Sequence, residues 1–299
     1  MNSSPLTGMG WGWLVGISIA GVSFGAPLPP EAAPAPAMPV VSNAAAAVPT
    51  LAPTISSIPA KQLVAEADAL LAAGKRSDAR SRYLAALDAG PADAGRATVE
   101  EKLGKLNVEL VRMPWAMSGK TNYTVQAGDS VRAIAQSFGT TVDLIVESNE
   151  LKRPDLIKPG DRLRVFAEKL AICVNKSRND LLVTANGRFF KRYRVGTGRF
   201  DRTPTGTFAV ADRIMEPVWW RPDGKTILYG DKENILGTRW LALQATGTTE
   251  AIKGYGIHGT WDDSSIGKAE SSGCIRLKNA DVEELFVLVP VGTAVTIEE

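Results

Sequence analysis

Histidine and cysteine are nearly absent from this sequence, with one histidine and two cysteines in 299 residues. Two cysteines do not make a disulfide framework, and no group of histidine, cysteine and acidic residues has the spacing of a metal site. The net charge of +2 gives no sign of a nucleic-acid partner, and no phosphate loop or nucleotide fingerprint occurs. We therefore expect no cofactor, no metal and no nucleic acid.

The rare residue types come together near the C-terminal end, where His258 precedes Cys274. The thiolate is the nucleophilic form of cysteine, and a nearby imidazole both favours it and can return a proton to a leaving group. Gly259 and Gly273 allow close backbone approach, and Gly273 and Cys274 can present consecutive N–H groups to an oxyanion. The spacing alone favours a simpler alternative, a buried cysteine and a hydrogen-bonded loop histidine. We expect two free thiols, with Cys173 a small core residue.

Three motifs in order resemble the L,D-transpeptidase catalytic domain (YkuD-like family). They are Thr203-Pro-Thr-Gly-Thr-Phe208, Asn234-Ile-Leu-Gly-Thr-Arg239, and the pair Tyr255-Gly-Ile-His-Gly-Thr260 and Ser271-Ser-Gly-Cys-Ile-Arg-Leu-Lys-Asn-Ala-Asp281. The resemblance implies a mixed β-sandwich with the cysteine and histidine facing each other in a cleft. It also implies cysteine acyl-enzyme chemistry on peptidoglycan stem peptides, forming 3→3 cross-links or attaching a protein to the cell wall. A carboxypeptidase or hydrolase of the same fold, and a catalytically weakened wall-binding scaffold, remain alternatives.

The resemblance assigns roles to individual residues. Cys274 attacks as thiolate, His258 stabilises it as imidazolium and protonates the departing D-Ala amine, and the Gly259 carbonyl orients the imidazole. The Gly273 and Cys274 N–H groups stabilise the oxyanion. The expected substrate-binding residues are Ser271, Ser272, Arg276, Arg239, Trp219, Trp220 and Tyr229. The arginines could meet diaminopimelate carboxylates or brace the cysteine loop, and the aromatic residues could form a lid or simply pack locally.

One position departs from the family pattern. Family members commonly carry a second histidine immediately before the Gly-Cys pair, whereas this chain has Ser272. A serine can donate a hydrogen bond but supplies no imidazolium charge, so acylation is expected to be slower or to rely on water. Because no other histidine exists, loss of His258 should leave no substitute base.

The segment 168–299 is expected to be mostly β structure, because short apolar or alternating runs are separated by Gly, Asn and Pro. The expected strands are Leu170-Val174, Leu181-Thr184, Phe189-Val195, Gly206-Ala211, Trp240-Leu243, Gly256-His258 and Ala294-Ile297. One helix is expected directly after the cysteine loop, capped by Asn279 and buried through Val282, Leu285, Phe286 and Leu288.

The segment 121–167 has a strand-helix-helix-strand pattern that resembles a LysM domain. Gly128-Asp129 supplies a turn and N-cap, and Thr141 caps the second helix. LysM domains bind N-acetylglucosamine-containing glycans in a shallow groove. By resemblance the groove residues are Gly128, Asp129, Ser130, Val131, Asn149 and Ile157. A fold that only positions the enzyme is the alternative.

The preceding residues divide into three parts. Residues 1–26 resemble an export signal, or a retained membrane anchor, although no Lys or Arg precedes the apolar stretch; residues 27–59 form an Ala/Pro-rich linker. Residues 60–116 have helical periodicity resembling part of a tetratricopeptide repeat, which predicts a spacer or a docking module for a protein partner. We therefore expect an exported α+β multidomain protein of the periplasm or cell envelope, with peptidoglycan as its partner and a wall-anchored protein as an alternative acyl acceptor.

Overall fold

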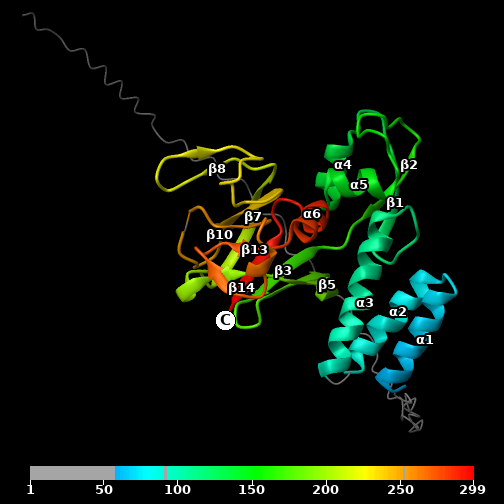
Figure 1. Ribbon diagram of the computed structural model, residues 1–299. Helices are drawn as coiled ribbons and strands as arrows, with labels where there is room; N and C mark the ends of the chain where they lie inside the picture. Colours follow the sequence, from blue (N-terminus) through cyan, green and yellow to red (C-terminus); the bar gives the residue numbers. More distant parts are fainter. Residues whose placement is uncertain (1–57, 91–92, 252) are drawn as a thin grey trace, which may run out of the picture. The chain divides into compact units, whose positions relative to one another are not determined.

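The computed structural model describes residues 58–90, 93–251 and 253–299 (Figure 1). The predicted export signal and nearly all of the linker lie outside the described residues. All the described residues belong to one compact unit. No helix among the described residues is long and apolar enough to cross a membrane.

Three helices open the described chain: α1 (Ala60–Ala72), α2 (Arg76–Asp88) and α3 (Asp93–Arg112). Small residues let α1 and α2 approach each other closely, since Ala67, Ala79 and Ala86 are fully buried. The ring of Tyr83 fills the space between the helices, and its hydroxyl donates to Asp68. Small residues packed around one aromatic ring are typical of a tetratricopeptide-like helical hairpin.

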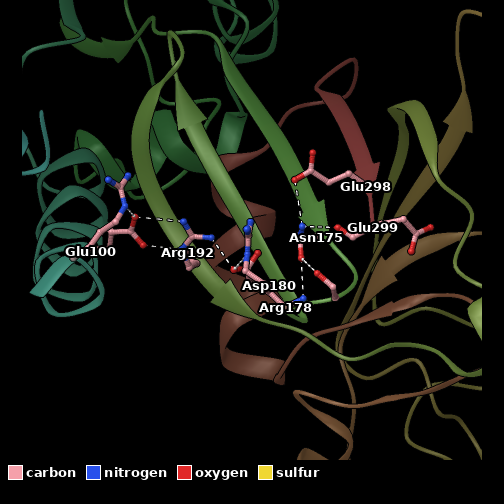
Figure 2. A network of polar contacts seen from close by, with 9 residues as sticks. Glu100, Asn175, Arg178, Asp180, Arg192, Glu298 and Glu299 are labelled. Atoms are coloured by element: carbon pink, nitrogen blue, oxygen red, sulfur yellow. Dashed lines mark hydrogen bonds and ion pairs between the residues drawn. The ribbon is translucent and has the colours of Figure 1, made fainter. Parts of the chain in front are cut away.

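The helices bury their remaining apolar face against the C-terminal segment. Leu103 and Leu106 of α3 belong to the same apolar cluster as Phe190, and the buried Asn107 donates from Nδ2 to the Phe190 carbonyl at 2.8 Å. Figure 2 shows the polar part of the contact, in which Arg192 donates to Glu100 at 2.7 Å and to Asp180 at 2.8 Å. The helical segment is thus joined to the C-terminal core within this unit.

The second segment is the predicted strand-helix-helix-strand unit. Its elements are β1 (Lys120–Thr124), α4 (Val131–Phe138), α5 (Val142–Ser148) and β2 (Arg162–Phe166), with β1 and β2 antiparallel. Ser130 caps α4 by accepting from the Ala133 amide at 3.1 Å, where the sequence pointed to Asp129. Thr141 caps α5 as predicted. The segment has a small core of its own, made of Val125, Val131, Ile134, Ala135, Ile145, Leu163 and Val165.

The C-terminal segment is built on an eight-stranded mixed sheet in the order β13-β11-β10-β7-β14-β3-β4-β5. In chain order its strands are β3 (Leu170–Asn175), β4 (Asp180–Ala185), β5 (Arg188–Arg194), β7 (Gly206–Met215), β10 (Arg239–Ala245), β11 (Gly256–His258), β13 (Ile275–Arg276) and β14 (Ala294–Glu298). The β11–β13 and β14–β3 pairs are parallel, and the others are antiparallel. All seven predicted strands are present, and the α+β multidomain prediction is confirmed.

Shorter elements surround this sheet. Two small sheets pair β6 (Thr197–Gly198) with β12 (Ala269–Ser271) and β8 (Trp219–Trp220) with β9 (Thr226–Ile227), and two single turns of 3-10 helix are η1 (Arg199–Asp201) and η2 (Asp263–Ser265). Both cysteines are free thiols. Cys173, expected in the core, is only half-buried because it alternates with the buried Ile172 and Val174 along β3.

The predicted final helix is α6 (Asn279–Leu288), which buries Val282, Leu285, Phe286 and Leu288. Its N-cap position is Lys278, which makes no side-chain capping bond. The prediction that Asn279 caps this helix is therefore wrong. Its side-chain oxygen instead accepts a hydrogen bond from the Thr238 amide at 3.1 Å. At the other end of α6, Thr141 donates to the Val287 carbonyl and Arg213 pairs with Asp143 at 3.0 Å, which links the second segment to the third.

Candidate active site

The loop that carries Cys274 is closed by hydrogen bonds between its own residues. The Ser271 hydroxyl donates to the Cys274 carbonyl at 2.6 Å and accepts from the Gly273 amide at 3.0 Å. Thr203 donates to the Gly273 carbonyl at 2.7 Å. The predicted role of the Gly273 N–H in an oxyanion hole is therefore not supported, because Ser271 already occupies that donor. The Cys274 amide has no hydrogen-bond partner among the described residues and remains available.

Glycine is required at position 273 for two reasons. Its φ of +138° lies in a region that side chains disfavour, and a Cβ there would lie 2.6 Å from the ring of Tyr255. Tyr255 itself donates from its hydroxyl to the Arg202 carbonyl at 3.3 Å. The tyrosine and the glycine thus fix how closely the cysteine loop approaches the strand that carries His258.

His258 is the last residue of β11, between β10 and β13. Its Nδ1 atom lies 2.6 Å from the Gly259 carbonyl oxygen, the contact that the resemblance implies. A carbonyl can only accept, so Nδ1 carries the hydrogen and the neutral ring has its lone pair on Nε2. The side chain is only 2% exposed, and the ring of Trp240 stacks against it at 5.6 Å between centroids.

Both reactive groups are shifted toward their uncharged forms. Burial lowers the pKa of His258 to about 4, against the opposing effect of the Gly259 carbonyl. Burial also raises the pKa of Cys274, although the Gly256 amide and the Arg276 charge favour the thiolate. These two shifts favour a neutral thiol and a neutral imidazole over the predicted thiolate–imidazolium pair, because burial of both groups penalises their charged forms. The Cys274 thiol donates to the Gly254 carbonyl at 3.7 Å.

An open cavity of about 610 Å³ holds both groups. It brings together seven of the predicted site residues: His258, Cys274, Ser271, Ser272, Arg276, Trp219 and Trp220. Ser272 is exposed, whereas Ser271 is buried in the loop. The remaining lining residues were not predicted from the sequence and are mostly apolar: Ile214, Pro217, Val218, Pro222, Ile235, Leu236, Trp240, Lys253, Gly254 and Tyr255.

The charge of this cavity has one sign. Among the described residues, Arg276 and Lys253 are the Lys and Arg side chains that line it, and no Asp or Glu does. The Arg276 Nε atom is buried and has no hydrogen-bond partner among the described residues. A guanidinium that lacks a carboxylate partner suits a ligand that brings its own carboxylate.

Comparison with known proteins identifies the family. Residues 169–297 match the L,D-transpeptidase catalytic domain (YkuD) and residues 123–166 match the LysM domain. YqjB of Bacillus subtilis, a relative named for this family, is 41% identical over 129 residues, which are 43% of this chain and 70% of YqjB. YkuD of the same organism is 31% identical over 182 residues, 58% of this chain and 97% of YkuD. The chain belongs to the L,D-transpeptidase family.

Two residues predicted to bind substrate lie elsewhere in this L,D-transpeptidase family member. Arg239 donates to the Thr238 carbonyl at 2.8 Å, lies over the ring of Phe286, and lines a separate cavity of about 390 Å³. Neighbouring residues of a strand point to opposite faces, so Arg239 cannot share the face of Trp240. Tyr229 packs beside Trp261, with ring centroids 6.3 Å apart, and does not line the catalytic cavity.

The LysM residues expected to bind glycan fall into two groups. Gly128 and Ser130 are exposed beside the first turn, and Ile157 is half-buried. The others serve the fold: Val131 is 1% exposed, Asp129 accepts from Tyr123 and from the Gln126 amide, and Asn149 pairs with both backbone groups of Arg164. Of the predicted groove residues, Val131 and Asn149 therefore have side chains that are engaged in the fold.

Proposed function

We propose that this protein is an active L,D-transpeptidase that uses Cys274 to transfer peptidoglycan stem peptides. The observation that carries the proposal is that Cys274 and His258 share a cavity whose other charged groups, Arg276 and Lys253, are cationic. Stem peptides whose third residue is of the diaminopimelate type carry free carboxylates, which these cations can bind. The membership of the chain in the family supports the same reaction class.

The first half-reaction starts from the neutral pair. His258 takes the thiol proton on Nε2 while the Cys274 sulfur attacks the carbonyl carbon between the third stem residue and the terminal D-Ala. The Cys274 amide stabilises the resulting oxyanion. The imidazolium then returns the proton to the departing D-Ala amine, the C–N bond breaks, and a thioester remains. The Gly259 carbonyl keeps Nδ1 protonated throughout, so Nε2 alone carries the transferred proton.

The second half-reaction reverses these roles. An acceptor amine attacks the thioester carbonyl and gives its proton to His258, after which the C–S bond breaks and the sulfur takes the proton back. An amine of a second stem peptide yields a 3→3 cross-link, and an amine of a wall-anchored protein yields an attached protein. The LysM segment, through its exposed turn around Gly128 and Ser130, holds the enzyme near glycan strands.

Acylation by a carbapenem tests the nucleophile. Wild-type protein should gain the mass of one inhibitor, Cys274→Ala should gain none, and Cys173→Ala should react like wild type. No adduct on folded wild-type protein would favour a binding scaffold instead. Purified muropeptides should then yield 3→3 dimers, whereas accumulation of trimmed tripeptides without dimers would show that water is the acceptor and that the protein is a hydrolase.

A further inference from the structure

We propose that Asn279 is a positioning residue that holds the Gly259 peptide, and through it the His258 imidazole, in the orientation needed for proton transfer. The inference rests on the proposed function for its catalytic meaning. Asn279 is the residue whose side chain was expected to cap α6 but instead accepts a hydrogen bond from the Thr238 amide.

The side chain of Asn279 occupies a notch between two glycines. A Cβ added to Gly259 would lie 2.2 Å from Asn279 Oδ1, and one added to Gly237 would lie 2.3 Å from the same atom. Oδ1 also accepts a hydrogen bond from the Thr238 amide at 3.1 Å. Only residues without a Cβ leave room for this oxygen, so Gly237 and Gly259 let the asparagine reach the backbone directly.

The notch lies one residue away from the imidazole. The Gly259 amide donates to the Arg239 carbonyl at 3.2 Å, which ties it to β10. Its carbonyl accepts from His258 Nδ1 at 2.6 Å. Asn279 packs against this glycine while binding the adjacent Thr238 amide, so it limits movement of the peptide that decides which ring nitrogen carries the hydrogen.

Asn279 lies on the same short segment of chain as Cys274. The Leu277 amide, two residues earlier, donates to the His258 carbonyl at 2.8 Å. Cys274, Leu277 and Asn279 therefore lie on one short segment that contacts residues 254–259 at three points, because the thiol also donates to the Gly254 carbonyl and Asn279 packs against Gly259. A shift of Asn279 would change the geometry between thiol and imidazole, and a displacement of about 1 Å can reduce a rate by about a hundredfold.

The single histidine makes the proposal directly measurable. With ¹⁵N-labelled histidine, the full chain gives one pair of ring-nitrogen signals, which report the tautomer. The leucine in Asn279→Leu has a similar volume but no hydrogen-bond acceptor. This variant should have a smaller population of the tautomer with hydrogen on Nδ1. Its maximal rate of acylation by a carbapenem should fall about tenfold or more, while the carbapenem concentration that gives half of the maximal rate should change little. Asn279→Asp keeps the acceptor oxygen and should restore the wild-type tautomer.

Asn107→Leu is the matched control, because it also removes a helix asparagine that bonds to a neighbouring backbone group. It should lower Tm while leaving the imidazole signals and the acylation rate unchanged. If Asn279→Leu loses stability in the same way but keeps the wild-type tautomer and rate, the proposal is overturned. Asn279→Ala, which favours the helix, replaces the leucine variant if that variant does not fold. Absence of acylation in wild type would refute the proposed function, while the tautomer measurement would still decide the role of Asn279.

Discussion

The indole ring of Trp240 stacks on the imidazole of His258, with ring centroids 5.6 Å apart and an interplanar angle of 23°. The two residues are directly opposite each other in the β10–β11 pair. This contact shields one face of the imidazole ring from water. It therefore contributes to the burial that lowers the pKa of His258 to about 4.

Replacing this ring should restore part of the ordinary basicity of the histidine. In Trp240→Leu, water reaches the imidazole, so the pKa of His258 should rise from about 4 toward 6.5. A titration of the single imidazole by NMR measures the change. Trp219→Leu, which removes another tryptophan of the same cavity, should leave this pKa close to its wild-type value, and an equal rise in both variants would contradict the assigned role of the stacking contact.

The pH dependence of stability should report the same burial. Because the pKa of His258 is about 4 in the folded state and about 6.5 in an unfolded chain, the unfolded state binds more protons between these values. This contribution to stability is fully present above pH 6.5, and it is lost progressively as the pH falls toward 4. The resulting loss in the free energy of unfolding is at most about 3 kcal/mol.

Urea unfolding at pH 7.5 and pH 4.5 checks this expectation in wild type and in His258→Gln. The glutamine variant cannot titrate at this position, so its free energy of unfolding should fall less over the same interval. The comparison removes the effect of carboxylates, which titrate in both proteins. Equal losses in the two proteins would mean that His258 is not desolvated to this degree.

Alanine at position 273 should disable the cysteine loop. The added Cβ would lie 2.6 Å from the Tyr255 ring at a φ of +138°, so the loop must move. We expect a fall in carbapenem acylation of at least about tenfold, read from the rate of adduct formation. Gly187→Ala has a φ of +77° but no atom near its Cβ, so it should show the backbone cost in Tm and keep the wild-type acylation rate.

Arg276 should govern recognition of anionic donors. Arg276→Gln removes one of the two cations that line the cavity, and it should raise KM for stem peptides with a free carboxylate at the third residue by about tenfold. Amidation of that carboxylate should remove the difference between variant and wild type. Arg239→Gln is the matched control, since this arginine lies outside the cavity, and its KM should stay close to the wild-type value.

The sequence predicted the frame of the site well. Alternating apolar runs located all seven of the expected strands, and the rarity of histidine and cysteine drew attention to His258 and Cys274, which the structure places in one cavity. The aromatic pair Trp219 and Trp220, two of the expected substrate-binding residues, also lines that cavity. These features depend on local periodicity and on motif order, both of which are properties of the chain itself.

The errors concern properties that depend on tertiary contacts. The low pKa of His258 follows from its burial, which no local pattern reveals. The Gly273 amide donates to the hydroxyl of Ser271, two residues away. Arg239 and Arg276 are the same residue type, but their positions in the sheet place them at different cavities. Strand alternation around Trp240 could have separated the two arginines. Tyr255 lay within the motif, and its packing against Gly273 became apparent only in three dimensions.

The contact between Asn107 and Phe190 lies at one edge of the large sheet. β5 is the last strand of the large sheet, and Phe190 falls where the β4–β5 register shifts, so its carbonyl lacks a regular strand partner. Helix α3 covers this edge and supplies the missing donor. An uncovered edge strand is a template for pairing with another chain. A catalytic fragment cut at residue 168 would expose that template, so we expect the fragment to self-associate more readily than the full chain.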